Sequence, residues 1–269
     1  MTPFEAAILA IVQAVTEFLP VSSSGHLILL PRLLGWSDQG LEFDIATNSG
    51  TLLAVMFYFR TDLAKMARGF GDSFSASGRA ANLEARLLYA MLLGTIPAAA
   101  AGLLIKDWVS TYGREPRLIA ATAIFYGLLL IVADRIGKKS RGEGEIGRSE
   151  ALLIGCAQAL ALVPGTSRSG ITMTAALLLG FARPAAARFS FLLAVPIGIL
   201  VAANQAKDAL LGVELGVPAT SLAIGILVSA IVGYAVIAFL LAWIRRRPLA
   251  PFGWYRVALG VALLLLFRG

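Results

Sequence analysis

Two polar phrases inside apolar sequence hold most of the residues that could do chemistry. TEFLPVSSSGHL runs from Thr16 to Leu27, and ALVPGTSRSGIT runs from Ala161 to Thr172. The sequences before them also match, with a one-residue slip at the proline of each phrase. Identical residues fall at one constant offset in four pairs: Glu5 and Glu150, Gln13 and Gln158, Ser24 and Ser169, and Gly25 and Gly170. The chain therefore contains the same helix-breaking unit twice.

The first phrase contains an acid on the same helical face as an amide. Glu17 follows Gln13 by one turn, so both side chains point toward the break. A carboxylate in apolar surroundings must be paired, protonated or bound to a metal. Carboxylate and amide oxygens suit Mg²⁺ or Ca²⁺, and we expect Glu17 and Gln13 to be metal ligands. The alternative is that Glu17 only ties down loop amides, and the second copy has Leu162 in its place.

His26 is the only histidine and directly follows three serines and a glycine. An imidazole with its ordinary pKa of about 6.5 exchanges protons near neutral pH. Ser23 could act as a nucleophile activated by His26; equally, His26 could attack or activate water. Ser22 and Ser24 could bind phosphate or cap the helix that follows. We therefore expect Ser23, His26 and Glu17 to be catalytic.

The second phrase places Arg168 inside PGTSRSG. Arginine presents a permanently charged fork that suits phosphate oxygens. Glycines let backbone amides approach an anion, and a helix N-terminus attracts negative charge. We expect a phosphate cradle made of Arg168, Gly165, Thr166, Ser167, Ser169 and Gly170. An arginine that merely neutralises Glu17 would give the same pattern.

Composition indicates a polytopic all-α membrane protein. The chain is 58% hydrophobic and 14% charged, with a mean hydropathy of +0.80, far from a soluble domain. Segments near the length of a membrane-spanning helix predict six spans: Phe43–Phe59, Leu87–Ile105, Leu118–Ala133, Ala185–Ala206, Val217–Ile244 and Phe252–Phe267. The single cysteine, Cys156, excludes disulfides within the chain, and we expect it to be a buried thiol.

Basic residues predict the orientation in the membrane. They cluster at Arg60–Arg86, Lys138–Arg148 and Arg245–Arg247, and such clusters are typical of cytoplasmic loops. The net charge of +7 has this topological explanation, and we expect no nucleic-acid partner. The segments Lys106–Arg117 and Lys207–Gly216, which carry less positive charge, then lie outside.

This orientation gives an inverted repeat with halves at about 1–136 and 149–269, in one membrane domain of residues 1–269. Each half has three spans preceded by a re-entrant helical hairpin, Pro3–Leu34 and Glu150–Ala182. Irregular backbone at membrane depth must be buried in protein or line a wet cavity, so the two breaks should meet near the midplane. Each hairpin could instead be one kinked span.

Second-tier candidates lie near the ends of the expected helices. Asp44, Thr47 and Asn48 start the segment after the first hairpin, and Arg188 starts the span after the second. Arg188 could equally be a cytoplasmic anchor whose long side chain reaches the membrane surface. No phosphate-binding loop of ATPases and no HExxH zinc motif is present.

The chain resembles the undecaprenyl pyrophosphate phosphatases, also called bacitracin resistance proteins, of bacterial plasma membranes. The resemblance covers nearly the whole chain and includes QAVTE at Gln13–Glu17, PGTSRSG at Pro164–Gly170 and FSFLLAVP at Phe189–Pro196. It implies hydrolysis of undecaprenyl pyrophosphate, which recycles the lipid carrier of peptidoglycan synthesis. It also implies a divalent metal and essential roles for Glu17, Ser23, His26 and Arg168.

The acidic motif of this family begins with Glu or Gln, and here it begins with Gln13, which supplies no charge. The expected site opens to the extracytoplasmic side. A homodimer is among the arrangements that the sequence leaves open. The main rival function is a transporter or flippase of an anionic polyprenyl phosphate, because inverted repeats with broken helices are typical of transporters. A second rival, the acid phosphatase-like lipid phosphatases, is disfavoured because that chemistry uses two histidines.

Overall fold

The computed structural model describes residues 1–73, 83–113, 115–210 and 216–267. Within these ranges the regular structure is helical, apart from one isolated bridge between Arg141 and Phe181. The first half of the chain contains α1 (Pro3–Phe18), α2 (Ser23–Leu34), α3 (Gly40–Tyr58), α4 (Arg60–Ser73), α5 (Leu83–Tyr112) and α6 (Pro116–Ile136). The second half contains η1 (Glu143–Glu145), α7 (Arg148–Leu160), α8 (Arg168–Leu178), α9 (Arg183–Leu210), α10 (Ala219–Ile244) and α11 (Ala250–Leu266).

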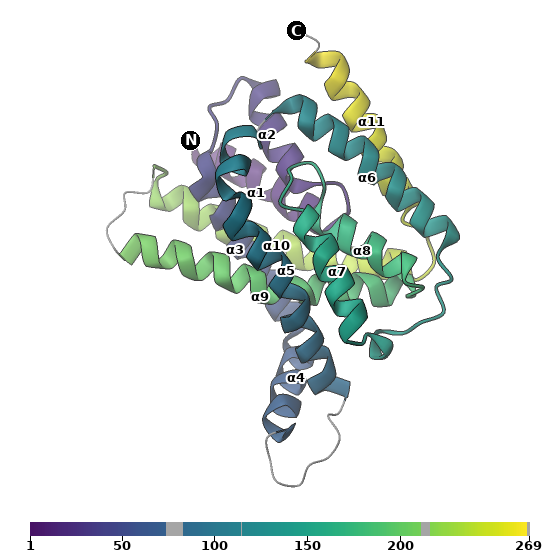
Figure 1. Ribbon diagram of the computed structural model, residues 1–269. Helices are drawn as coiled ribbons and strands as arrows, with labels where there is room; N and C mark the ends of the chain where they lie inside the picture. The colour runs from purple at the N-terminus through teal and green to yellow at the C-terminus, as the bar shows by residue number, and fades with distance from the viewer. Residues whose placement is uncertain (74–82, 114, 211–215, 268–269) are drawn as a thin grey trace.

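The two expected pairs of short helices are confirmed as α1 with α2 and α7 with α8 (Figure 1). Helix α1 starts with a capping box between Thr2 and Glu5, which satisfies backbone donors at its N-terminus. It ends at Phe18, because Pro20 has no N–H with which to continue the helix. The polar breaks are residues 19–22 and 161–167.

Four helices in the described part of the chain are long and apolar enough to cross a membrane, so the protein is a multi-pass membrane protein. They are Leu83–Ile105 within α5, Pro116–Ile136, Arg183–Gln205 within α9 and Ala219–Ile244. Helix α11 is apolar but has 17 residues. Helix α3 covers the other expected span and carries polar residues in its first half.

Four expectations about local structure were wrong for the described residues. The beginning of Arg60–Arg86, expected as a loop between two spans, forms the amphipathic helix α4, while residues 74–82 lie outside the described part. Most of the expected loop Lys106–Arg117 continues α5 as far as Tyr112. Helix α9 likewise continues through Lys207 to Leu210, and residues 211–215 of that expected loop are not described. Cys156 is exposed, because it lies on the outer face of α7, whereas the neighbouring Gly155 is buried against α5.

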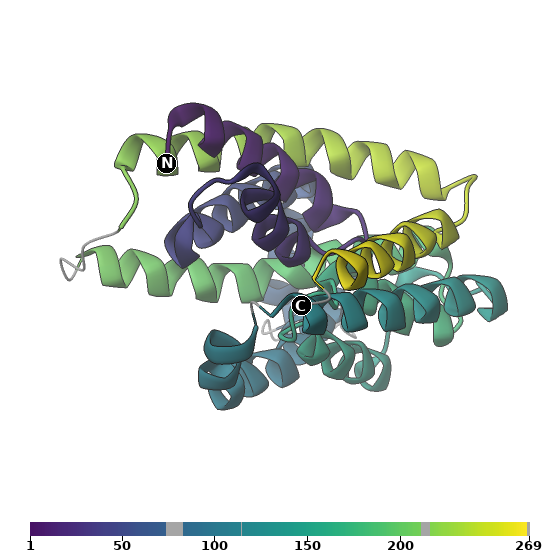
Figure 2. The same ribbon diagram turned by 90° about the horizontal axis from the view of Figure 1, so that it is seen from above.

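The first helix of each hairpin packs on a long helix from the other half of the chain. Helix α1 lies on α10, α7 lies on α5, and α6 and α11 run side by side in both views (Figures 1 and 2). Small residues allow these close approaches. A Cβ on Gly155 would meet the backbone of Gly94, and one on Gly253 would lie 2.7 Å from the carbonyl oxygen of Gly127.

Ion pairs and a hydrogen bond connect the three basic segments of the chain. Arg188 binds Glu143 (Nε to Oε2, 2.8 Å) and Asp62 (Nη2 to Oδ1, 3.4 Å). The buried Asp134 binds Arg183 (2.5 Å) and accepts a hydrogen bond from the amide of Leu249, just after the third basic cluster. These contacts bring the α3–α4 junction, the linker between the halves and the α10–α11 turn together. The arm formed by α4 and the start of α5 extends away from the other helices (Figure 1).

Candidate active site

The two breaks end in the same local structure. Ser22 and Ser167 are the N-caps of α2 and α8, with φ angles of +77° and +69°. Their hydroxyls accept hydrogen bonds from the amides of Gly25 (3.5 Å) and Gly170 (3.2 Å). A left-handed φ is uncommon for serine, and here it turns the chain from the break into the helix. The helices therefore start with Ser23 and Arg168.

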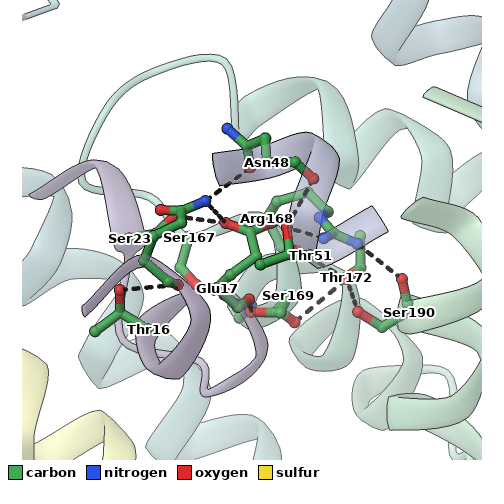
Figure 3. A network of polar contacts seen from close by, with 12 residues as sticks. Thr16, Glu17, Ser23, Asn48, Thr51, Ser167, Arg168, Ser169, Thr172 and Ser190 are labelled. Carbon is green, nitrogen blue, oxygen red and sulfur yellow. Dashed lines mark hydrogen bonds and ion pairs between the residues drawn. The ribbon is translucent and has the colours of Figure 1, made fainter. Parts of the chain in front are cut away.

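These first helical residues both bind the carboxylate of Glu17 (Figure 3). Arg168 Nη2 lies 2.8 Å from Oε1, and Ser23 Oγ donates to Oε2 at 2.6 Å. The side chains of Glu17 and Arg168 are only 13% and 19% exposed. Low exposure strengthens both contacts relative to water. The structure thus shows the Arg168–Glu17 ion pair that the alternative to a phosphate cradle predicts.

Ser24 and Ser169, which occupy equivalent positions in the two copies, form hydrogen bonds between the two phrases. Ser24 Oγ accepts from the amide of Gly165 at 3.3 Å, and Ser169 Oγ donates to the carbonyl of Glu17 at 2.9 Å. Gly165 has a φ of +86°, and a Cβ there would lie 2.7 Å from the carbonyl oxygen of Ile119 in α6. Only glycine fits this turn. The two polar breaks therefore form one site.

Helix α9 binds the Arg168 nitrogen that does not contact Glu17. Nη1 donates to the carbonyl of Ser190 at 3.1 Å. The Ser190 hydroxyl lies 2.7 Å from Thr172 Oγ1, and both side chains are buried (Figure 3). Ser190 belongs to the FSFLLAVP phrase, which sequence reasoning used only to recognise the family. This phrase supports the orientation of Arg168.

Gln13 completes the cluster on the α1 side. Its Nε2 donates to Asn48 Oδ1 at 2.8 Å and lies 3.4 Å from Glu17 Oε2. Its Oε1 is buried and has no hydrogen-bond partner. An unpartnered oxygen beside a carboxylate fits a hard divalent cation, which often takes one or two carboxylates and completes its shell with substrate phosphates. No group of three or more His, Cys, Asp or Glu residues suited to a metal occurs among the described residues.

The His26 ring hydrogen-bonds to groups other than the Glu17 carboxylate. Its Nδ1 lies 2.7 Å from the carbonyl oxygen of Ser22, and its Nε2 lies 2.7 Å from the hydroxyl of Tyr255 in α11. Neither ring nitrogen of His26 hydrogen-bonds to Ser23, and both residues are described in the structure. The hydroxyl that we expected His26 to activate is bonded to Glu17 instead.

Arg256 in α11 is a functional candidate that sequence reasoning missed. It is completely buried, and its Nη2 donates to the carbonyls of Gly165 (2.9 Å) and Thr166 (2.7 Å). The Thr166 hydroxyl is itself buried without a partner. A lone charge in the apolar segment Phe252–Phe267 was the signal that could have found it, since ionisable groups at membrane depth are rarely incidental. Tyr255 gave no such signal.

The second-tier candidates separate into two groups. Asn48 joins the site through Gln13. Asp44 accepts a hydrogen bond from Gln39 Nε2, and the Thr47 hydroxyl bonds back to its own helix. Arg188 lies in the ion-pair network with Asp62 and Glu143, on the ring of Phe59, and is not part of the Glu17 cluster.

Comparison with known proteins identifies the family of this chain. The model of the bacitracin resistance protein BacA matches residues 6–262. A relative from Magnetococcus marinus, named undecaprenyl-diphosphatase, is 52% identical over 98% of both chains. One from Stutzerimonas stutzeri, named undecaprenyl-diphosphatase 2, is 48% identical over the full length of both. An undecaprenyl-diphosphatase from Nitrosococcus oceani is 48% identical over 96% of this chain and 97% of its own. The chain therefore belongs to the bacitracin resistance protein BacA family.

Proposed function

We propose that this protein hydrolyses undecaprenyl diphosphate to undecaprenyl phosphate and inorganic phosphate in the bacterial plasma membrane. The observation that carries the proposal is the convergence of Ser23 and Arg168 on Glu17. In the proposed reaction these three residues are the nucleophile, the phosphate-binding cation and the proton acceptor. The relatives that share the chain's full length carry the name of this activity.

Substrate binding uses the second break. Arg168 exchanges one carboxylate oxygen of Glu17 for the oxygens of the diphosphate, while its Nη1 stays on the Ser190 carbonyl. The N-terminus of α8 and the amides around Gly165 add positive potential. Ser22, Ser24, Ser167 and Ser169 hold the two breaks in place by caps and cross-links. Most of these serines thus support the binding site rather than contact phosphate.

The first chemical step transfers the terminal phosphoryl group to Ser23. A bond forms between Ser23 Oγ and the terminal phosphorus, and the bond from that phosphorus to the bridging oxygen breaks. The Ser23 proton passes to Glu17 Oε2, which already accepts its hydrogen bond at 2.6 Å. Undecaprenyl phosphate leaves with the bridging oxygen. Arg168 neutralises charge on the phosphoryl group as it transfers.

The second step returns Ser23 to its starting state. Water attacks the phosphoserine, the Ser23 Oγ–phosphorus bond breaks, and inorganic phosphate leaves. His26 takes the proton from water at Nε2, where the Tyr255 hydroxyl changes from donor to acceptor. The imidazole lies one helical turn after Ser23. Glu17 returns the first proton to Ser23, and His26 releases the proton that it took from water to the solvent. The sum is one diphosphate and one water converted to two monophosphates.

A divalent cation is part of the proposal. Gln13 Oε1 and the Glu17 carboxylate are the atoms that would hold Mg²⁺ or Ca²⁺. When bound, such a cation would neutralise charge on the diphosphate oxygens. This predicts that a chelator lowers phosphate release and that added Mg²⁺ or Ca²⁺ restores it.

The membrane arrangement proposed is an inverted repeat of six spans with two re-entrant hairpins, α1–α2 and α7–α8. Three observations support it: the similar caps, the reciprocal hydrogen bonds between the two phrases, and the ion pairs and hydrogen bond that join the three basic segments at one side. If that side is cytoplasmic, the first hairpin enters from outside. The site then opens to the extracytoplasmic side, and the polyprenyl tail extends between helices into the bilayer.

Cysteine labelling tests this orientation. Ser37→Cys, in a chain whose Cys156 is replaced by serine, is expected to react with a membrane-impermeant reagent applied to intact cells. Reaction only after the cells are permeabilised would place the α2–α3 connection in the cytoplasm and overturn the orientation.

Phosphate release by the purified protein tests the proposed reaction. We expect Ser23→Ala to lose about 10³-fold or more in kcat, as removal of a nucleophile does. Ser49→Ala is the matched control, because the Ser49 hydroxyl bonds to the carbonyl of Ile45 in its own helix, away from the Glu17 cluster. A trapped phosphoserine at position 23 supports the scheme, and a phosphohistidine at position 26 contradicts it. A wild-type protein that released no phosphate but moved polyprenyl phosphate across vesicles would instead be a transporter.

A further inference from the structure

The last helix contacts both breaks through adjacent residues. Arg256 binds the carbonyls of Gly165 and Thr166 in the second break. Tyr255, one position earlier, reaches His26 beside the first break. The buried Arg256 therefore fixes α11 relative to the second break, and α11 in turn fixes Tyr255 relative to His26. No other described side chain hydrogen-bonds the imidazole.

The geometry at His26 sets which atom holds each proton. The Ser22 carbonyl can only accept, so the short contact of 2.7 Å requires a proton on Nδ1. In a neutral ring Nε2 is then an acceptor, and the Tyr255 hydroxyl donates to it. In a charged ring Nε2 donates, and the same hydroxyl accepts. A phenol can do both, so the contact survives gain or loss of a proton by His26.

We infer that Tyr255 is a positioning residue for His26. Its hydroxyl holds the ring in one orientation through a cycle in which the ring takes and releases a proton. The two rings are nearly parallel, with an interplanar angle of 8° and centroids 5.7 Å apart. Phenylalanine would keep this ring contact and lose only the hydrogen bond. The inference rests on the proposed hydrolysis for its kinetic consequence, but its structural consequence does not depend on it.

Nuclear magnetic resonance of the histidine ring tests the contact without any turnover. Because the chain has one histidine, protein labelled with ¹⁵N-histidine gives the two ring nitrogens of His26 alone. Tyr255→Phe is expected to shift the Nε2 resonance, and Tyr234→Phe is not. Tyr234 is the matched control because it is a partly exposed tyrosine of α10 whose ring contacts are with Phe57 and Tyr58. An Nε2 resonance unchanged by Tyr255→Phe would overturn the inference.

Kinetics test the consequence for the reaction. Tyr255→Phe should lower kcat about tenfold, a part of the 10²–10⁴-fold that a positioned acid or base contributes. KM should stay within about twofold, because Tyr255 makes no contact with Arg168 or Glu17. In a His26→Ala background Tyr255→Phe should add less than about twofold. Equal losses in both backgrounds, or a kcat within twofold of wild type, would contradict positioning through His26. A wild-type protein without phosphate release would refute the proposed function and leave the resonance test standing.

Discussion

The two breaks share one backbone design but carry different chemistry. Ser22 and Ser167 have the same left-handed φ and the same cap, and the next residue of each break reaches the same carboxylate. That next residue is Ser23 in the first break and Arg168 in the second. Glu17 itself has no counterpart, because the matching position is Leu162. Repetition therefore supplies two equivalent positions around one acid that has no counterpart in the other copy. In the proposed reaction one position is the nucleophile and the other is the phosphate-binding cation.

The cross-links between the breaks show the same relation. Ser24 and Ser169 are equivalent, and each binds the backbone of the opposite break. The two serines are alike for a structural reason, since each hydrogen-bonds to the backbone of the other phrase. His26, in contrast, is matched by Ile171. The serines that are alike in the two copies hold the two breaks together. In the proposed reaction Ser23, His26 and Arg168, which differ between the copies, carry out the chemistry.

Of the predictions that compare the two breaks, the largest expected effect is a loss of activity when Arg168 is replaced. Arg168→Lys keeps a positive charge but loses the planar fork that spans Glu17 Oε1 and the Ser190 carbonyl. We expect kcat/KM for undecaprenyl diphosphate to fall about 10²–10³-fold, the loss typical of a removed transition-state donor. Phosphate release in detergent measures it.

Arg188→Lys is the matched control, because Arg188 pairs with Asp62 and Glu143 away from the site. Its activity should stay near that of the wild type. If Arg168→Lys turned over within about fivefold of wild type, Arg168 would be a partner of Glu17 and no phosphate ligand.

The sequence predicted the paired hairpins and the meeting of the breaks because their signals are local. Proline ends α1, and a repeated Ser-x-Ser-Gly turn starts both following helices. The clustering of Glu17 with Arg168 then followed from membrane physics, since irregular backbone must be buried in protein or line a wet cavity. These inferences did not depend on which helices pack against each other.

The partner of each catalytic group could not be predicted in the same way. Whether Ser23 bonds to Glu17 or to His26 depends on a rotation of α2 that the sequence does not encode locally. The contact from Tyr255 to His26 joins residues 229 positions apart and depends on how α11 packs against α6. The ends of α5 and α9 were also misjudged, because charged residues near a membrane surface can continue a helix as well as end it.

A smaller effect tests whether the two caps are equivalent. Ser22→Ala and Ser167→Ala each remove the hydroxyl that accepts from Gly25 or Gly170. Each should lower the free energy of unfolding by about 1 kcal/mol, the usual value of an N-cap. Glycine at either position should cost less, because it adopts the left-handed φ without strain. Thermal unfolding in detergent compares the four variants. A loss at one break and none at the other would show that the caps are not equivalent.

The smallest expected effect distinguishes the helices that lead into the breaks. Glu5 and Glu150 are equivalent capping-box residues, and each accepts from a backbone amide, of Thr2 at 2.7 Å and Gly147 at 3.1 Å. Only Glu150 also binds Arg141, at 2.8 Å. The pKa of Glu150 is lowered from 4.5 to about 2, chiefly by this hydrogen bond from Arg141 and further by hydrogen bonds from the backbone and from Ser149.

Because the folded-state pKa is lowered, the stability that Glu150 adds is complete above about pH 5 and is lost as the pH falls from about 4.5 toward 2. At pH 7 Glu150→Gln should lower the free energy of unfolding by about 0.5–1 kcal/mol, as for a partly exposed ion pair. Its difference from the wild type should narrow on acidification, as measured by thermal unfolding between pH 7 and pH 3. Glu5→Gln, which removes the capping carboxylate without an ion pair, should cost less at pH 7. Equal losses for both variants at pH 7, or a Glu150→Gln difference unchanged at pH 3, would show that Arg141 adds nothing and that the N-termini of α1 and α7 are alike in energy as well as in shape.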